Sequence, residues 1–392
     1  MKFETNYPYV LIHGMFGFGA DEKIYDFLPY WGMMTGNICT YLEGEGFETY
    51  APSISPISGA WDRACEIYAQ LVGGTVDYGK AHSEKYGHKR YGRTYKKPLF
   101  EGWGKDKKIN MLGHSFGGPT IRLFATLMAH GCDDEMAVTS KDDISPLFTG
   151  GKGDWIHSIT AAACVHEGTT LMYSMKAFMD LLEKGTTFAA NIAGGKFSKI
   201  YEFHAEQWDL NGIDENGKSK KSSLNKERQR AMIASRDNVY YDLTLHGAQE
   251  INEKIKCVDD IYYFSWPCLS TSQQFFTKKP KHTPLLRTCP FFIPMARSIG
   301  KYSKNTISDV KIDESWLPND GLVPVVSAKA PFNEPHMDLY DAHGKYKSGV
   351  WYVYDEFVMD HLAIIGGILP PANTAKIRQI YRDHFRLINN LK

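Results

Sequence analysis

The chain has 392 residues, equal numbers of basic and acidic side chains (45 each) and a hydrophobic content of 43%. This composition is typical of a globular protein long enough for one large domain, and the zero net charge argues against a nucleic-acid surface. No apolar run approaches a membrane span, and 7 cysteines without CxxC spacing indicate neither a disulfide framework nor a cysteine zinc site. The N-terminus has no apolar signal core, which fits a cytoplasmic protein or a secreted one without its leader.

The first predicted strand runs from Tyr7 to Ile12 and ends at His13-Gly14-Met15. A His-Gly-x turn after the first core strand is where serine hydrolases place a backbone N–H of their oxyanion hole. We therefore predict that the N–H of Met15 is one oxyanion donor. A plain strand-to-helix loop is the alternative.

Residues 61–100 are predicted to form an insertion. Its first residues, 61–66, open a helix with Asp62 in the first turn, and a later loop carries His82 and His88. The segment is rich in His, Gly and Tyr and too poor in aliphatic residues to form a layer of a sheet. Two nearby histidines with a carboxylate upstream can supply part of a zinc site, although two solvated histidines would explain the spacing as well.

The stretch 108–118 carries the strongest motif. An apolar run leads into Gly113-His114-Ser115-Phe116-Gly117, and apolar residues at helical spacing follow. Strand, sharp turn with a serine, then helix is the context of a nucleophile elbow, in which a Cβ at 113 or 117 would collide with backbone. We predict Ser115 as a nucleophile and the N–H of Phe116 as the second oxyanion donor.

Residues 171–240 are predicted to form a lid or cap region. A strand from Ile156 to Val165 precedes an apolar helix face that is rich in methionine, and residues 214–230 are polar and pass from a loop into a helix. Soft apolar faces of this kind suit adaptable binding, and one placed between core strands can close over an active site. A helix packed in the core is the alternative.

The last part of the chain contains an aromatic strand, a loop punctuated by prolines, a further extended piece and a closing amphipathic helix. These predicted elements cover 261–265, 280–294, 350–354 and the stretch from 375.

A serine nucleophile needs a general base, and the base needs a carboxylate that fixes its tautomer. In α/β-hydrolases the order along the chain is Ser, then Asp or Glu, then His. His361 follows the last strand-like segment, and Asp320 lies in an Asn-Asp-Gly turn. We therefore predict Ser115 as nucleophile, His361 as base and Asp320 as its orienting acid. The alternatives are His336, His343 and His384 for the base, and Asp313 and Asp338 for the acid.

Several further motifs are specific to one family. They are Trp61-Asp62-Arg63-Ala64-Cys65-Glu66, the stretch 68–79, Ala81-His82, Gly87-His88, Gly92-Arg93-Thr94-Tyr95, Ser145-Pro146-Leu147-Phe148, Tyr241-Asp242-Leu243, Asn319-Asp320-Gly321 and Asp360-His361-Leu362. On these residues the chain resembles the secreted, zinc-containing true lipases of thermophilic bacilli and staphylococci, a branch of the α/β-hydrolases.

The resemblance implies one α/β-hydrolase domain over 1–392, with a mostly parallel sheet, a zinc-binding insertion at 61–100 and a helical lid at 171–240. It places the family's triad on the three residues chosen above. It also implies a zinc ion whose ligands match Asp62, His82, His88 and Asp242, with Trp61 and Trp208 beside it. Four protein ligands leave no open position, so this zinc is expected to be structural.

The sequence also departs from the family. The family's calcium site uses a Glu two residues after the catalytic His and then an Asp, whereas this chain has Ala363 and then Gly366-Gly367-Ile368. We therefore expect no calcium there. Met15 and Phe116 stand where the family has Phe and Gln, so both backbone N–H groups are kept but the acyl pocket changes shape.

These observations predict a secreted serine carboxylic-ester hydrolase that acts on acylglycerols or similar apolar esters, at an interface or a polymer surface, through an acyl-enzyme on Ser115. A broad carboxylesterase or a polyester-degrading hydrolase with the same triad is the alternative. A zinc metallohydrolase is disfavoured because the chain has no His-Glu-x-x-His. A lipid-binding relative without activity is disfavoured by the complete triad, and a cytoplasmic location stays open.

Overall fold

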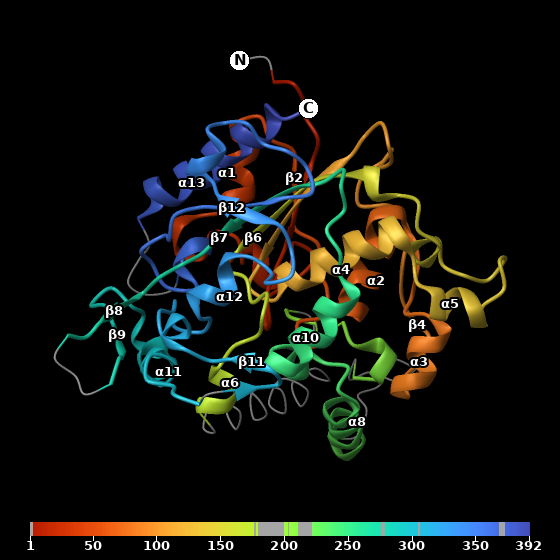
Figure 1. The fold of residues 1–392 in the computed structure, drawn as a ribbon. Coiled ribbons are helices and arrows are strands. Elements are labelled where there is room, and N and C mark those ends of the chain that lie inside the picture. Colours follow the sequence, from red (N-terminus) through yellow and green to blue (C-terminus); the bar gives the residue numbers. More distant parts are fainter. Residues whose placement is uncertain are drawn as a thin grey trace.

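The computed structural model describes residues 3–175, 178, 200–202, 204–210, 222–275, 279–304, 306–367 and 373–392 (Figure 1). Its centre is a sheet of seven parallel strands in the order β12-β13-β7-β6-β5-β1-β2. The strands are β1 (Tyr9–Ile12), β2 (Thr49–Tyr50), β5 (Ile109–His114), β6 (Ile156–Ala162), β7 (Tyr262–Trp266), β12 (His336–Asp338) and β13 (Trp351–Val353). This sheet confirms the predicted α/β class.

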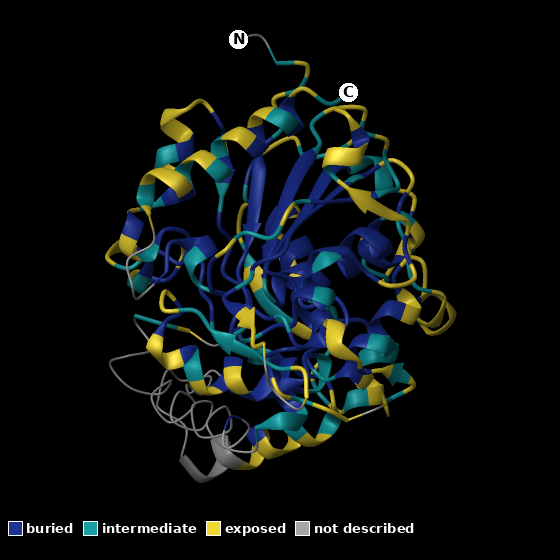
Figure 2. Ribbon diagram, turned by 60° about the vertical axis from the view of Figure 1, so that its left-hand side comes forward, coloured by how far each residue is buried: buried dark blue, intermediate teal, exposed yellow. Residues whose placement is uncertain are grey.

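Helices cover both faces of the sheet. Side chains that alternate along β1 enter different cores: Tyr9 and Leu11 pack with α1 (Ile38–Gly44) and α13 (Thr374–Asn389), whereas Val10 and Ile12 pack with α2 (Ala60–Val72), α4 (Gly117–His130) and α10 (Leu245–Lys254). Figure 2 shows the central strands buried and the outer sides of the helices exposed. The remaining helices are shorter or peripheral: α3 (Lys80–Tyr86), α5 (Asp133–Val138), α6 (Leu171–Ser174), α8 (Ser222–Ser235), α9 (Val239–Asp242), α11 (Ile293–Ile299) and α12 (Val325–Lys329).

The segment predicted as an insertion stays outside the central sheet. Its strands β3 (Gly74–Asp77) and β4 (Tyr91–Tyr95) pair only with each other, antiparallel, and α3 lies between them in the chain. Two further small sheets pair β8 (Thr271–Gln273) with β9 (His282–Pro284), and β10 (Thr306–Ile307) with β11 (Val310–Lys311).

The prediction of a loop over 280–294 is wrong in part. This stretch contains β9, a 3-10 turn (Pro290–Phe292) and the start of α11. Its prolines occupy positions that regular elements tolerate, because Pro284 ends a strand at the edge of a small sheet, whereas Pro290 and Pro294 lie in first turns. Such prolines do not interrupt the elements that contain them.

Half of the predicted lid lies outside the described residues, namely 176–177, 179–199, 203 and 211–221 of the region 171–240. In the part that the structure describes, Leu171, Met172 and Phe178 are buried in the core beside α2 and α4. No helix within the described ranges is long and apolar enough to cross a membrane.

Candidate active site and metal site

Ser115 lies at a sharp turn between β5 and α4. Its φ is +57°, in the left-handed region that non-glycine residues rarely adopt, and its N–H donates to the carbonyl of Ala162 (2.9 Å). A Cβ at Gly113 would lie 2.5 Å from the backbone of Gly117, and one at Gly117 would lie 2.3 Å from the carbonyl of Ile12. The geometry is that of the predicted nucleophile elbow.

His361 and Asp320 are in direct contact. His361 Nδ1 lies 2.7 Å from Asp320 Oδ2, and both residues are buried. The other carboxylate oxygen, Oδ1, accepts the N–H groups of Leu322 (2.9 Å) and Val323 (2.8 Å), and the N–H of His361 donates to the carbonyl of Asp320 (2.9 Å). Because Oδ2 accepts from Nδ1, the imidazole keeps Nε2 as its basic nitrogen.

The alternatives for base and acid are placed elsewhere. Asp313 caps a 3-10 turn on the surface through the N–H of Ser315, and Asp338 is exposed in β12. His384 is buried in α13, whereas His336 and His343 are exposed. Among these candidates for base and acid, the structure therefore places only His361 and Asp320 in contact.

A hydrogen-bonded relay joins this pair to the turn after β1. His114 Nε2 lies 2.9 Å from the carbonyl of His361, and its Nδ1 lies 2.6 Å from the hydroxyl of Tyr30, which in turn accepts the N–H of Gly14 (2.9 Å). A carbonyl only accepts, so Nε2 carries the proton, Nδ1 accepts from the Tyr30 hydroxyl, and every member of the relay is neutral. Burial lowers the pKa of His114 well below its ordinary value and raises that of Tyr30.

The two predicted oxyanion donors lie in the turns that follow β1 and β5. Among the described residues, the N–H groups of Met15 and Phe116 have no acceptor, whereas the N–H of the neighbouring Phe16 donates to the carbonyl of Pro56 (3.1 Å). Met15 follows the relay residue Gly14, and Phe116 precedes the first turn of α4. Both groups are therefore available to an oxygen that develops negative charge.

Arg63 on α2 holds the turn after β1 through hydrogen bonds. Its guanidinium is fully buried and donates to the carbonyls of His13 and Ser55 and to the hydroxyl of Thr120 on α4. Arg63 also lies over the ring of Phe116, at 5.3 Å from the ring centre. The residue before it in α2, Asp62, points into a second site.

This second site gathers four side chains whose ligand atoms all lie within 4.8 Å of one another: Asp62, His82, His88 and Asp237. Asp62 Oδ1 and Asp237 Oδ2 both lie 3.3 Å from His82 Nε2. His88 Nε2 lies 3.2 Å from Asp237 Oδ2, yet the two make no aligned hydrogen bond. His88 Nδ1 lies 2.8 Å from the carbonyl of Lys89 and therefore carries the proton, which leaves a lone pair on Nε2.

This arrangement fits a cation better than it fits four isolated side chains. A bare nitrogen beside a carboxylate oxygen is repelled unless a positive charge lies between them, and the buried Asp62 Oδ1 lacks a hydrogen bond. The second oxygen of Asp62 accepts from Gln207 (2.6 Å), as outer groups do around metal ligands. Trp61 stacks on His82 at 4.9 Å, and Trp208 lies 5.1 Å from His88, beside the site as expected.

The predicted ligand set needs one correction: Asp237, not Asp242, completes the group. Asp242 Oδ2 accepts the N–H of Ala60 (2.8 Å) at the first turn of α2. Burial and, to a smaller extent, the nearby carboxylate of Asp237 raise the pKa of Asp242 to about 8 despite that bond. Asp242 therefore anchors the helix that carries Asp62 and does not point at the four ligand atoms.

The fold and the serine turn together define an α/β-hydrolase, and comparisons with known proteins agree. EstA from Clostridium botulinum is 35% identical, with a TM-score of 0.84 over 100% of this chain and 88% of that chain. The lipase of Staphylococcus hyicus is 30% identical, with a TM-score of 0.83 over 98% of this chain and 96% of that chain.

A family model described as lipase-like, C-terminal domain, matches residues 5–391, and the chain belongs to this family. Lipase 1 of Staphylococcus aureus is 33% identical over 386 residues, which are 97% of this chain and 54% of that protein. The chain thus spans about half the length of the curated relatives it matches.

Proposed function

We propose that the protein is a serine carboxylic-ester hydrolase of the triacylglycerol lipase type. The observation that carries the proposal is the buried contact between His361 and Asp320 beside the strained turn that presents Ser115. His114 connects the two parts, because it directly precedes Ser115 and bonds to the carbonyl of His361.

In this proposal, His361 Nε2 takes the proton of the Ser115 hydroxyl while Oγ attacks the acyl carbon. The N–H groups of Met15 and Phe116 receive the negative charge of the carbonyl oxygen. His361 then gives its proton to the departing alcohol, which leaves an acyl-enzyme. A water molecule, deprotonated by the same nitrogen, attacks the acyl carbon, and the acid and free Ser115 are released. Asp320 keeps the tautomer that makes each transfer productive.

The deciding experiment is a hydrolysis profile over ester chain length, below and above substrate solubility, for the wild type and for Ser115→Ala. Wild-type turnover that rises sharply above the solubility limit supports a lipase. Activity confined to short soluble esters supports the alternative carboxylesterase, which the altered Met15 and Phe116 side chains leave open, and activity on a polyester film supports a polyesterase. Turnover that persists in a folded Ser115→Ala variant would contradict the whole proposal.

We also propose that the four-residue group holds zinc. Asp62, His82, His88 and Asp237 are a mixed nitrogen and oxygen set that zinc accepts, and four protein ligands leave no position for a substrate. The ion would supply structure, since it joins α2, α3 and the turn before α9. Metal analysis of the purified protein, with recovery of the melting temperature when zinc is added after chelation, tests this role.

Two further parts of the proposal come from the family resemblance. A secreted location predicts that a producing culture holds the activity outside the cells. The expected lack of calcium at 363–368 predicts that calcium leaves the melting temperature unchanged, and a tight stoichiometric calcium effect would contradict it.

A further inference from the structure

Residues 271–275 and 279–304 form a basic corner of the molecule. They comprise the β8–β9 hairpin, the 3-10 turn Pro290–Phe292 and α11, at the lower left of Figure 1. The sequence from 261 to 308 contains no Asp or Glu, whereas the frequency in the chain, 45 in 392, would give about five. It contains seven basic residues: Lys278, Lys279, Lys281, Arg287, Arg297, Lys301 and Lys304. A chain of zero net charge thus concentrates positive charge in one segment.

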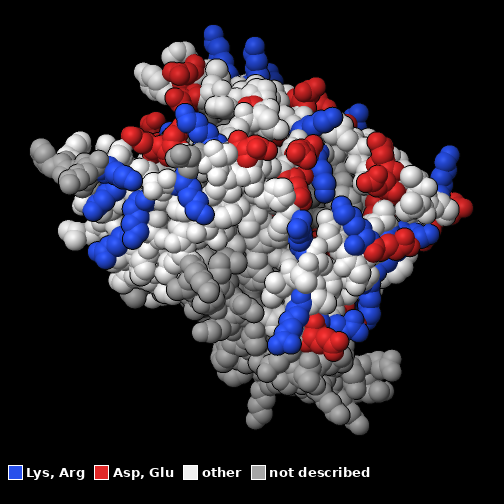
Figure 3. Space-filling view, turned by 60° about the horizontal axis from the view of Figure 1, so that its bottom comes forward, with Lys and Arg blue, Asp and Glu red and all other residues white. Residues whose placement is uncertain are grey.

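Five of these cations form no ion pair with any described residue: Lys281, Arg287, Arg297, Lys301 and Lys304. All but Lys281 are exposed. Some cations elsewhere on the surface have acidic partners, as Arg386 has Glu45 (3.1 Å) and Lys329 has Glu356 (2.7 Å). In Figure 3, the left-hand part of this face below its top shows Lys and Arg without Asp or Glu, whereas Lys and Arg are mixed with Asp and Glu in its upper and right-hand parts. Unpaired like charges repel one another, so folding alone does not account for them.

Large apolar side chains are exposed on the same corner. Phe275 is 74% exposed, Leu286 is fully exposed and Phe291 is 60% exposed. Single exposed apolar residues are common, but three on one hairpin and its following turn form a surface that favours an apolar partner.

This surface lies next to His361, the proposed catalytic base. The ring of Phe292, next to the exposed Phe291, stands edge-on to the ring of His361 with the centres 6.5 Å apart. The N–H of Cys289 donates to the carboxylate of Asp360 (2.9 Å), the residue before His361. A layer that touched Phe291 would therefore lie beside the site where an ester must enter.

We infer that the described part of this corner, residues 271–275 and 279–304, docks the protein on an anionic lipid layer. Phe275, Leu286 and Phe291 enter the apolar phase while the five cations meet the headgroups. The cations and the exposed apolar side chains together identify the partner. Nucleic acid would match the cations, but it has no apolar phase for the exposed Leu286. A second copy of this chain, docked through the same surface, would place its cations against these cations, and their repulsion disfavours such a dimer. The inference rests on the proposed function, because docking here would deliver esters to Ser115.

The test measures binding without turnover, by sedimentation of the Ser115→Ala protein with vesicles. Equimolar phosphatidylglycerol and phosphatidylcholine should bind it more tightly than phosphatidylcholine alone, and salt should weaken the difference. Each cation near an anionic layer contributes about fivefold, so adding Arg287→Gln and Arg297→Gln should lower the binding to anionic vesicles about twentyfold. Adding Phe275→Ser and Leu286→Ser should lower binding to both kinds of vesicle.

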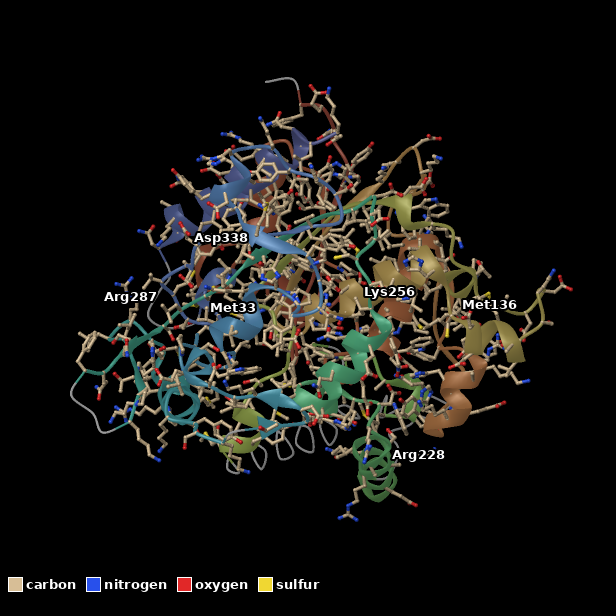
Figure 4. The ribbon with its side chains drawn as sticks, viewed as in Figure 1. Met33, Met136, Arg228, Lys256, Arg287 and Asp338 are labelled. Carbon is tan, nitrogen blue, oxygen red and sulfur yellow. The ribbon has the colours of Figure 1, made fainter. Side chains whose placement is uncertain are left out.

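Matched control variants carry the same changes elsewhere. Lys96→Gln with Lys256→Gln removes two exposed cations, and Met136→Ser with Val138→Ser removes two exposed apolar side chains. Figure 4 shows Lys256 and Met136 on the opposite side of the molecule from Arg287. Both control variants should bind like the parent.

Three outcomes would overturn the inference: equal binding to both vesicle types, equal losses in the control variants, or self-association that Leu286→Ser abolishes. The last would assign the surface to a dimer. Turnover of a short soluble ester, measured for each surface variant with Ser115 intact, separates the two proposals. If no protein in the series turns over the ester, the proposed function fails whatever the vesicles show.

Discussion

Replacing Tyr30 with Phe tests whether the relay through His114 positions the catalytic groups. The ring stays, with its edge contacts to Phe18 (5.8 Å) and Trp31 (5.3 Å), and only the hydroxyl is lost. That hydroxyl has two buried partners, the N–H of Gly14 and Nδ1 of His114. The substitution therefore leaves one donor and one acceptor without a partner.

The expected cost follows from these two groups. A buried polar group without a partner costs about 1–3 kcal/mol, so the two groups together should lower the free energy of unfolding of Tyr30→Phe by about 2–6 kcal/mol. Activity should fall as well, because Gly14 precedes Met15, the proposed oxyanion donor, and His114 holds the backbone of His361. Since small displacements of catalytic groups are costly, we expect kcat to fall about tenfold or more while KM changes little.

The assay is steady-state hydrolysis of a soluble ester well below the melting temperature, together with urea unfolding. Tyr25→Phe is the matched control: Tyr25 is also buried, also contacts Phe18 edge-on (6.4 Å), and loses only a weak bond to Cys39 at 3.5 Å. It should cost less than about 1 kcal/mol and leave kcat unchanged. If Tyr30→Phe loses stability but keeps the kcat of Tyr25→Phe, the relay is only structural and the positioning argument is refuted.

Three other substitutions test separate parts of the site. Asp237→Asn should lower the zinc content of the purified protein and Asp242→Asn should not, because only Asp237 reaches the ligand group; equal metal loss would restore Asp242 as a ligand. Asp320→Asn should lower kcat about ten-thousand-fold with the fold unchanged in circular dichroism, because the base is then held in the wrong tautomer. Burial lowers the pKa of His384 to about 3, against about 6.5 when unfolded, so stability is present above pH 6.5 and is lost as the pH falls. Between pH 7 and 5 the wild type should lose about 2 kcal/mol more than His384→Gln in urea titrations, and parallel losses would contradict this.

The three residues proposed for the triad could be selected from the sequence because a local pattern marks each of them. Ser115 sits in a strand-turn-helix context, and His361 follows the last strand of a parallel sheet. The carboxyl ends of parallel strands meet at one edge, so the order of elements along the chain already places such residues together. The signal that selected Asp320 was the tight Asn-Asp-Gly turn before that last strand.

The metal-binding group shows a limit of prediction from local sequence patterns, because the sequence selected Asp242 in place of Asp237. Asp237 and Asp242 are five residues apart: Asp237 precedes the short helix α9, and Asp242 is its last residue. Both lie near Gly59, which precedes α2. Asn238 caps α9 through the N–H of Tyr241 (3.0 Å), so the two aspartates leave the helix at opposite ends. One end faces the ligand atoms and the other faces the N–H of Ala60. Spacing alone does not show which carboxylate meets Asp62, because the contact spans about half of the chain.

The hydrogen-bonded relay from Tyr30 through His114 to His361 could not be predicted from local sequence patterns at all. His114 occupies the variable position of Gly-x-Ser-x-Gly, so the motif assigns it no role, and Tyr30 stands in a stretch with no recognisable catalytic pattern. Their bond joins residues 84 positions apart, and the bond from His114 to His361 spans 247. Only the closure of β1 against β5 brings these polar groups together in an apolar interior, where each must find a partner. The need for such partners, rather than any local pattern, selects Tyr and His at these two positions.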